Sequence, residues 1–250
     1  MLPEKPATEP RRKWHLLRWT FVVFAIVVGW GGWRHYDFRQ AVKEAKERGW
    51  GFKYDDPADV IRADWRAAFR KETWSGTERD LSIHTGTVSE RDFDLIRRLK
   101  PKQLSITATF PWRDLSELEG LLTLTELRLL HCPELTNIDA LKDMKELTVL
   151  WVYGSPVLVN INPVKKLKNL SALCLNNCDA LENVDELREV ESLEFLSLFG
   201  CTGLKNVDGL HGLTGLRGVI LDGSTGLTKE AVDKLKAALP KAAVESDYDK

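Results

Sequence analysis

The sequence predicts an α/β repeat solenoid preceded by one transmembrane helix, and three observations indicate this fold class. Apolar residues recur every 23 positions along much of the chain. Within each unit they alternate as in a short strand, and then recur three residues apart as in a helical turn. Near the N-terminus, an uncharged stretch is flanked by tryptophans. The expected parts are a disordered tail (1–13), a transmembrane helix (14–33), a charged helical stalk (34–49), an N-terminal cap (50–77), the repeats with a C-terminal cap (78–246) and a last tail (247–250).

Composition limits the classes of function. The 250 residues carry a formal net charge of −1 with a pI near 6.5, so no broad basic field attracts nucleic acid. The four cysteines form no CxxC pair and have no histidines at metal-ligand spacing. No glycine-rich phosphate loop, HExxH pair or paired-carboxylate motif occurs. We therefore expect a protein that is not an enzyme and that uses no metal or cofactor.

The membrane anchor is predicted from length and flanking residues. The uncharged run from Trp19 to Trp33 reaches only about 22 Å at about 1.5 Å per residue, less than a hydrocarbon core of about 30 Å. Counting from Trp14 gives twenty residues, and the one charge among them, Arg18, is close enough to the helix end to reach the headgroups. Tryptophans near both ends favour the membrane interface. The stretch 14–33 is therefore expected to span the bilayer.

Two other signals compete with this interpretation. A cleaved signal peptide also begins with a basic segment and a short apolar run, but this run ends in bulky residues with no small-x-small site. Arg11 and Arg12 weakly resemble a twin-arginine export signal. Basic residues are equally frequent on both sides of the span, while the short N-terminal tail favours the N-terminus inside. The repeats are then expected on the extracytoplasmic side. In the stalk, the charges of 37–48 are expected to form a solvated helix face.

The internal repeat is the strongest feature of the sequence. The first position of each unit is leucine, the fourth and sixth are strand-like, and the twelfth and fifteenth are also apolar. These positions hold Leu124, Leu147, Leu170, Leu193 and Leu216; Leu127, Leu150, Leu173, Leu196 and Val219; Leu129, Val152, Leu175, Leu198 and Leu221; Leu135, Leu158, Leu181, Leu204 and Leu227; Ile138, Ile161, Val184 and Val207. Burial within one unit contributes on the order of 10–20 kcal/mol, whereas ordering it costs on the order of 30 kcal/mol. Units must therefore stack to fold.

The segments LTELRLLHCPEL, LSALCLNNCDAL and LEFLSLFGCTGL resemble the LxxLxLxxCxxL segment of cysteine-containing leucine-rich repeats. This resemblance implies a curved solenoid with a parallel sheet on the concave face and short helices or turns on the convex face. With its tail, span and stalk, the chain is similar to single-span, membrane-anchored leucine-rich repeat proteins of bacteria. A unit beginning at Pro101 fits the same register, and Leu81 and Ile83 lie one period upstream.

Both ends of the repeats carry signals for caps. Residues 228–239 are expected to form a closing helix with Thr228 as its N-cap and Pro240 as its stop, followed by a strand at Val244. In front of the repeats, 50–54 is expected to be a lead strand and 57–71 an amphipathic helix.

Two polar ladders have structural interpretations. The ninth position holds Cys132, Cys178 and Cys201, with Ser155 and Ser224 in other units; the resemblance implies small, inward-pointing residues. Strand spacing leaves a Cys178–Cys201 disulfide as an alternative. The second ladder consists of Asn137, Asn160, Asn183 and Asn206, followed two residues later by Asp139, Asp185 and Asp208. We expect these aspartates to cap the following turns and the asparagines to bond neighbouring backbone, with calcium binding as the alternative.

The concave face contains the candidate partner-binding residues, because the third, fifth and seventh positions of each unit point away from the core. The candidates are Leu130, Val149, Trp151, Tyr153, Phe195, Phe199 and Ile220. Between the aromatic groups, the small residues Ala172, Cys174 and Asn176 are expected to leave a shallow depression. Exposed aromatics indicate a site for a protein or peptide. Two alternatives remain: a structural envelope protein that self-associates, and a patch covered by residues 34–75 of the same chain.

Overall fold

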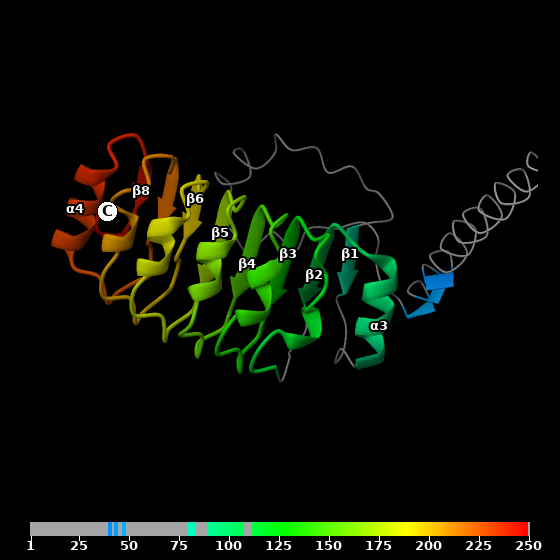
Figure 1. Cartoon of the computed structure of the whole chain (residues 1–250). Coiled ribbons are helices and arrows are strands. Elements are labelled where there is room, and N and C mark those ends of the chain that lie inside the picture. The colour runs from blue at the N-terminus through cyan, green and yellow to red at the C-terminus, as the bar shows by residue number, and fades with distance from the viewer. Residues whose placement is uncertain are drawn as a thin grey trace, which may run out of the picture.

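The computed structural model describes residues 40, 41, 43, 44, 47, 48, 80–83, 90–107 and 112–249. Eight strands form one sheet in which the spatial order follows the chain order (Figure 1). The strands are β1 (Asp80–Ile83), β2 (Gln103–Thr107), β3 (Glu126–Leu130), β4 (Val149–Tyr153), β5 (Ala172–Asn176), β6 (Phe195–Ser197), β7 (Gly218–Ile220) and β8 (Ala243–Glu245). Every neighbouring pair is parallel, which confirms the expected parallel sheet.

Strand pairing keeps one register along the repeats. Leu104 lies opposite Leu127, and Leu127 lies opposite Leu150, so each residue pairs with the one 23 positions further along. Leu173 and Leu196 continue the same ladder on β5 and β6. These leucines are buried to 1% exposure or less, because alternate side chains of a strand share one face. The core is a column of stacked apolar layers behind the sheet.

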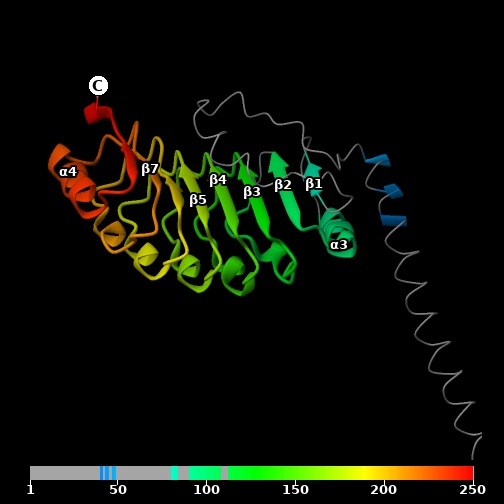
Figure 2. The same ribbon diagram turned by 90° about the horizontal axis from the view of Figure 1, so that it is seen from above.

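Short 3-10 helices cover the back of this column and form the convex side of the arc (Figure 2). They are η2 (Ser116–Leu118), η3 (Asp139–Asp143), η4 (Asn162–Lys166), η5 (Asp185–Glu189) and η6 (Asp208–Leu210). Their apolar side chains, such as Leu141 and Leu187, are fully buried against the strands. The fold is thus the leucine-rich repeat solenoid that the sequence predicted.

The asparagine side chains, and not the aspartate side chains, accept the first N–H group of these helices. Asn137 Oδ1 accepts the N–H of Asp139 at 3.1 Å, and Asn183 Oδ1 accepts the N–H of Asp185 at 3.2 Å. Asn160 and Asn206 make equivalent bonds, and Asp114 does so in the preceding unit. The expectation that the aspartates act as caps is therefore wrong, because the donor that needs a partner is the aspartate's own N–H. The expectation that the asparagines bond neighbouring backbone is confirmed.

A left-handed residue follows the strand in five successive units. Their φ angles lie between 54° and 75°, the region in which glycine is favoured. The residues are His131, Gly154, Asn177, Gly200 and Gly223. This conformation turns the chain sharply away from the sheet after each strand. The two non-glycine members are types that tolerate it better than most.

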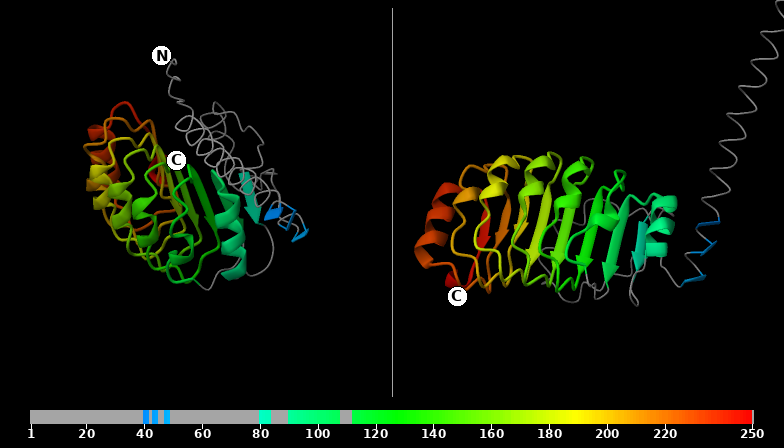
Figure 3. Two further views of the ribbon diagram at one scale, coloured as in Figure 1. Left: turned by 45° about the vertical axis from the view of Figure 1, so that its right-hand side comes forward. Right: turned by 60° about the horizontal axis from the view of Figure 1, so that its bottom comes forward.

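The C-terminal cap forms as predicted. Helix α4 (Lys229–Ala238) begins after Thr228, whose hydroxyl accepts the N–H of Ala231 at 3.2 Å, and it ends before Pro240. Strand β8 then adds the last parallel strand beside β7. Helix α4 lies at the C-terminal end of the array (Figure 3), and its Val232 and Leu235 side chains are buried in the core.

Helix α3 (Glu90–Leu99) covers the other end of the described solenoid and was not anticipated from the sequence. Phe93 and Ile96 are buried, and the Phe93 ring lies 4.9 Å from the Trp112 ring between centroids. Arg97 donates to the carbonyl of Glu117 at 2.8 Å, which ties the helix to the next unit. The lead strand expected at 50–54 and the helix expected at 57–71 lie outside the described residues.

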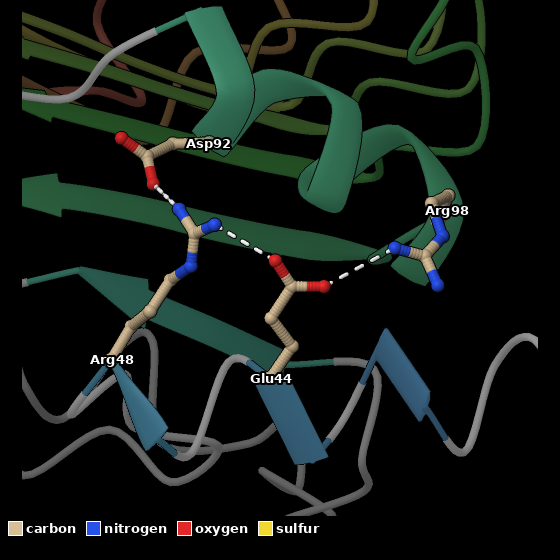
Figure 4. A network of polar contacts seen from close by, with 4 residues as sticks. All are labelled: Glu44, Arg48, Asp92 and Arg98. Atoms are coloured by element: carbon tan, nitrogen blue, oxygen red, sulfur yellow. Dashed lines mark hydrogen bonds and ion pairs between the residues drawn. The ribbon is translucent and has the colours of Figure 1, made fainter.

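The segment before the cap is in contact with α3. Residues 40, 41, 43, 44 and 47 are helical, as expected for the stalk. Its charges do not all form a solvated face, however, because Glu44 and Arg48 bond to α3 (Figure 4). Among the residues that the structure describes, no helix has the length and hydropathy needed to cross a bilayer. The predicted span at 14–33 lies outside these residues and stays a prediction.

Candidate interaction surface on the concave face

The concave face is formed by three rows of side chains that run across the strands. Parallel pairing in register places equivalent positions of successive units side by side. The first row is Gln103, Glu126, Val149, Ala172, Phe195 and Gly218; the second is Ser105, Arg128, Trp151, Cys174, Ser197 and Ile220; the third is Thr107, Leu130, Tyr153, Asn176 and Phe199. The rows divide the face into a polar end on β2 and β3 and an aromatic part on β4 to β6.

Two aromatic groups flank the small residues of β5. Val149, Trp151 and Tyr153 project from β4 and are half-buried, and Phe195 on β6 is half-buried as well. Phe199, just after β6, is 45% exposed. Between the groups, the three face residues of β5 are Ala172, Cys174 and Asn176, with exposures of 1%, 5% and 4%. The small β5 side chains are thus buried between larger neighbours on β4 and β6, and the shallow depression expected there stays a prediction.

Trp151 is held from one side by a charged pair that the sequence reasoning missed. The Arg128 guanidinium carbon lies 4.3 Å from the centroid of the indole ring. The same guanidinium forms an ion pair with Glu126 on its own strand, and both side chains are only 10% exposed. A cation over an indole face and a neighbouring carboxylate each stabilise the arginine. The sequence did contain a sign of this contact, because Glu126 and Arg128 occupy concave-face positions in the unit before Trp151.

Asn176 and His131 support the other aromatic residues. Asn176 Oδ1 accepts the Ser197 hydroxyl at 2.6 Å and the Phe199 N–H at 3.2 Å. This side chain thereby fixes the backbone at Phe199, where β6 has already ended. The His131 ring meets the Tyr153 ring edge to face, with 5.7 Å between centroids. The aromatic part of the face is therefore supported by specific neighbours.

The other predicted face residues differ in exposure. Leu130 is half-buried and lies opposite Tyr153, so it extends the aromatic part. Ile220, which was expected to belong to the exposed stripe, is only 9% exposed and so adds little accessible surface to the concave face. It lies opposite Ser197, a small residue in the same row.

The polar end carries buried oxygen atoms. Gln103 Oε1, Ser105 Oγ and Thr107 Oγ1 on β2 are buried and have no hydrogen-bond partner in the described part of the chain. They lie opposite Glu126, Arg128 and Leu130, respectively. Buried polar atoms ordinarily have partners, so these three oxygen atoms are exceptions within the described face.

The position-nine ladder has a structural role. All four cysteines are free and buried. The Cys201 thiol donates to the carbonyl of Leu175 at 2.8 Å, and the Ser224 hydroxyl donates to the equivalent carbonyl of Leu198 at 2.6 Å. Burial raises the pKa of Cys132 to about 12, and a hydrogen bond with Cys201 together with burial raises the pKa of Cys178. The raised pKa makes the Cys132 and Cys178 thiols poor nucleophiles, which agrees with small buried residues in a structural role.

No metal site is evident in the described ranges. Within them, no group of three or more His, Cys, Asp or Glu side chains is arranged to hold an ion. The Asn and Asp ladders instead bond to backbone and to each other, as when Asn160 Nδ2 donates to Asp139 Oδ1 at 3.2 Å. Calcium binding by these ladders therefore has no support from their geometry.

Comparisons with known proteins give similarity to solved structures only. No family model matches the sequence, and no curated protein sequence matches it. Internalin C2 from Listeria monocytogenes is 20% identical with a TM-score of 0.47, covering 67% of this chain and 80% of that one. Internalin F from the same organism is 21% identical with a TM-score of 0.44, over 65% of this chain and about half (52%) of its own. The leucine-rich repeat domain of the type III effector XopL is 17% identical with a TM-score of 0.47, over 86% and 96%. The repeat fold assigned here rests on the strand order and register of this chain itself.

Proposed function

We propose that this chain is a membrane-tethered interaction module that binds a protein or peptide through the concave face of its solenoid. The observation that carries the proposal is the pair of aromatic groups on β4 and β6, with Phe199 exposed between strand and loop. Large aromatics that become desolvated at the centre of a contact are frequent hot spots. No feature of the described residues points to a catalytic role for this face.

The dimensions of the aromatic part suit a polypeptide segment. Neighbouring strands lie about 4.8 Å apart, so side chains on β4 and β6 are separated by about 10 Å. That separation is close to the diameter of an α-helix and to the width of an extended segment with its side chains. Arg128 and Asn176 hold Trp151 and Phe199 in place before binding. A preorganised surface loses less conformational entropy on association.

A photo-crosslinking experiment tests the proposed face. A benzophenone amino acid replaces Phe199 in the full chain, and illumination in cells should produce a defined crosslinked product with a partner. A second benzophenone variant at Val159, which is 60% exposed outside the three rows, serves as the control. Products formed equally at both positions would argue against a specific concave site. A crosslink to a peptide from residues 34–75 would show that the chain itself covers the face.

A double substitution measures the energetic part of the proposal. Trp151→Ala with Phe199→Ala should leave the fold intact, because both residues lie outside the buried ladder, and should reduce partner recovery at least tenfold. Hot-spot truncations typically cost about 2 kcal/mol or more each. The matched control is Leu122→Ala with Val159→Ala, which removes two apolar side chains that are 51% and 60% exposed elsewhere. Unchanged recovery with the folded Trp151–Phe199 variant would redirect attention to the convex side.

The tether is the second part of the proposal. Residues 14–33 are the proposed span, and the short N-terminal tail with its basic residues favours the repeats on the extracytoplasmic side. The chain should stay in the membrane pellet after carbonate extraction and retain residues 14–33 by mass spectrometry. Protease added to intact spheroplasts should digest the repeats. Protection until lysis would reverse the orientation, and a mature N-terminus beyond Trp33 would show a cleaved signal.

The size of the native particle distinguishes partner binding from self-association. A binder without its partner should migrate as a monomer on a blue-native gel in mild detergent. A stable homo-oligomer that persists in the Trp151–Phe199 double variant would instead favour the structural envelope role.

A further inference from the structure

Four charged residues connect helix α3 to the segment that contains residues 40–48 (Figure 4). They are Asp92 and Arg98 on α3 and Glu44 and Arg48 on the segment. Arg48 forms an ion pair with Asp92 on α3 and donates to Glu44 Oε1 at 2.8 Å. The second oxygen of Glu44 accepts Arg98 Nη1 of α3 at 3.3 Å. Arg48 therefore contacts two carboxylates, and Glu44 contacts two guanidinium groups.

Burial distinguishes the inner side of the segment from its outer side. Ala41 is completely buried and belongs to the same core cluster as the repeats. The side chains of Arg48 and Glu44 are 32% and 40% exposed, and that of Asp92 is 13% exposed. On the outer side, the Lys43–Glu47 pair is 72% and 66% exposed. One side of the segment is thus docked, while the other remains in solvent.

The contact extends into the solenoid without a flexible joint among the described residues. Phe93 and Ile96 bury α3 in the core, and Arg97 bonds to the carbonyl of Glu117 in the next unit. Residue 48 is therefore connected to the first repeats through its contact with Asp92 and through α3.

We propose that the described residues between 40 and 48, together with α3, form an electrostatic latch that joins the preceding part of the chain rigidly to the solenoid. The sequence pattern alone indicated a solvated stalk, which would let the repeats rotate freely. A docked segment instead holds the solenoid in one orientation relative to the preceding part of the chain. Because its ion pairs are partly exposed, the latch weakens as ionic strength rises and the screening length falls from about 10 Å at 0.1 M to about 3 Å at 1 M.

One consequence rests on the proposed membrane tether. Six residues, 34–39, separate the predicted span from residue 40. The seven Cα–Cα steps from residue 33 to residue 40 reach no further than about 25 Å in any conformation. The latch would then hold the α3 end of the solenoid close to the bilayer, with the strands and the concave face presented to partners beside the membrane.

Hydrogen exchange of the full chain in detergent tests the latch. Short charged helices fray in water, so the amides of the described residues between 40 and 48 stay protected only while the segment is docked. The variant Asp92→Arg with Arg98→Glu places like charges against Arg48 and Glu44. Hydrogen exchange in this segment should become roughly tenfold faster or more. In the unaltered chain, 1 M NaCl should also make the exchange of this segment faster.

Two further variants separate docking from helix stability and from unfolding of α3. Adding Glu44→Arg and Arg48→Glu to the α3 variant inverts the whole network and should restore protection. The exchanged pair Lys43→Glu with Glu47→Lys alters the same helix on its solvent side and should change nothing. Glu44→Gln with Arg48→Gln leaves α3 untouched and should release the segment while the amides of β3 to β7 stay protected.

The proposal is overturned if the α3 variant and the Glu44–Arg48 variant both leave exchange of 40–48 unchanged, or if the Lys43–Glu47 control has an equal effect. Its outcome is independent of the tether. A latch that behaves as described in a chain that carbonate extracts from membranes would remove only the membrane part of the proposed function.

Discussion

Truncation of Leu173 to alanine tests the register on which the concave face depends. Leu173 lies on β5 between Leu150 and Leu196 of the neighbouring strands and is completely buried. The substitution removes three carbon atoms, worth about 2.4 kcal/mol at about 0.8 kcal/mol per buried methylene. Strands on both sides limit collapse of the cavity, which adds to the loss. We expect the free energy of unfolding to fall by about 3–5 kcal/mol.

Urea unfolding followed by circular dichroism measures this change, and Leu122→Ala is the matched control. Leu122 is 51% exposed, so the same truncation there should cost less than about 1 kcal/mol. Repeat arrays can lose cooperativity, so the comparison holds where the urea dependence of the variants matches that of the original chain. A loss below about 1 kcal/mol at Leu173, or equal losses at both sites, would refute the register.

Three further predictions concern turns, caps and thiols. Asn183→Ala should cost about 1 kcal/mol of unfolding free energy, because the Asp185 N–H loses its acceptor, whereas Asp185→Ala should cost less; urea titration of the two variants compares them. Gly200→Ala should destabilise by about 1–3 kcal/mol, because φ is +70° and the new Cβ would lie 2.1 Å from Asn177 Oδ1; Gly212→Ala, with open space around it, should stay within about 1 kcal/mol of the original chain in the same assay. Burial raises the pKa values of Cys132 and Cys174 from 9.0 to about 12, so the folded protein holds protons that the unfolded chain releases, and stability should fall as pH rises from about 9 to 12. That decline should be shallower in the Cys132→Ala, Cys174→Ala variant, and an unchanged slope would contradict the assignment.

The buried ladder was predictable from sequence because its signal is local and repeated. Leucines such as Leu150 and Leu173 recur at one spacing, and a solenoid maps equal spacing onto equal position. The closing helix was predictable for a similar reason, since Thr228 and Pro240 are local start and stop signals. Alternation along β4 also placed Trp151 on the face opposite the core.

Other features depended on contacts between units. The pair of Glu126 and Arg128 against Trp151 joins two strands, and its geometry follows from side-chain conformations that no period encodes. The role of Asn176 depends on the early end of β6, which leaves the N–H of Phe199 to a side chain. The low exposure of Ile220 likewise reflects its surroundings and not its position in the unit.

What the sequence by itself determined is the repeated layer: which side of each strand is buried and how the array ends at α4. These properties depend on the spacing of apolar residues within one unit, because that spacing decides which side chains share the buried face. Only the tertiary structure decided how separate parts of the chain meet, including the bonds from Asn176 to Ser197 and Phe199 and the docking of Glu44 and Arg48 on α3. Charged and polar side chains have several partners within reach, and the distances that choose among them exist only after the layers have stacked.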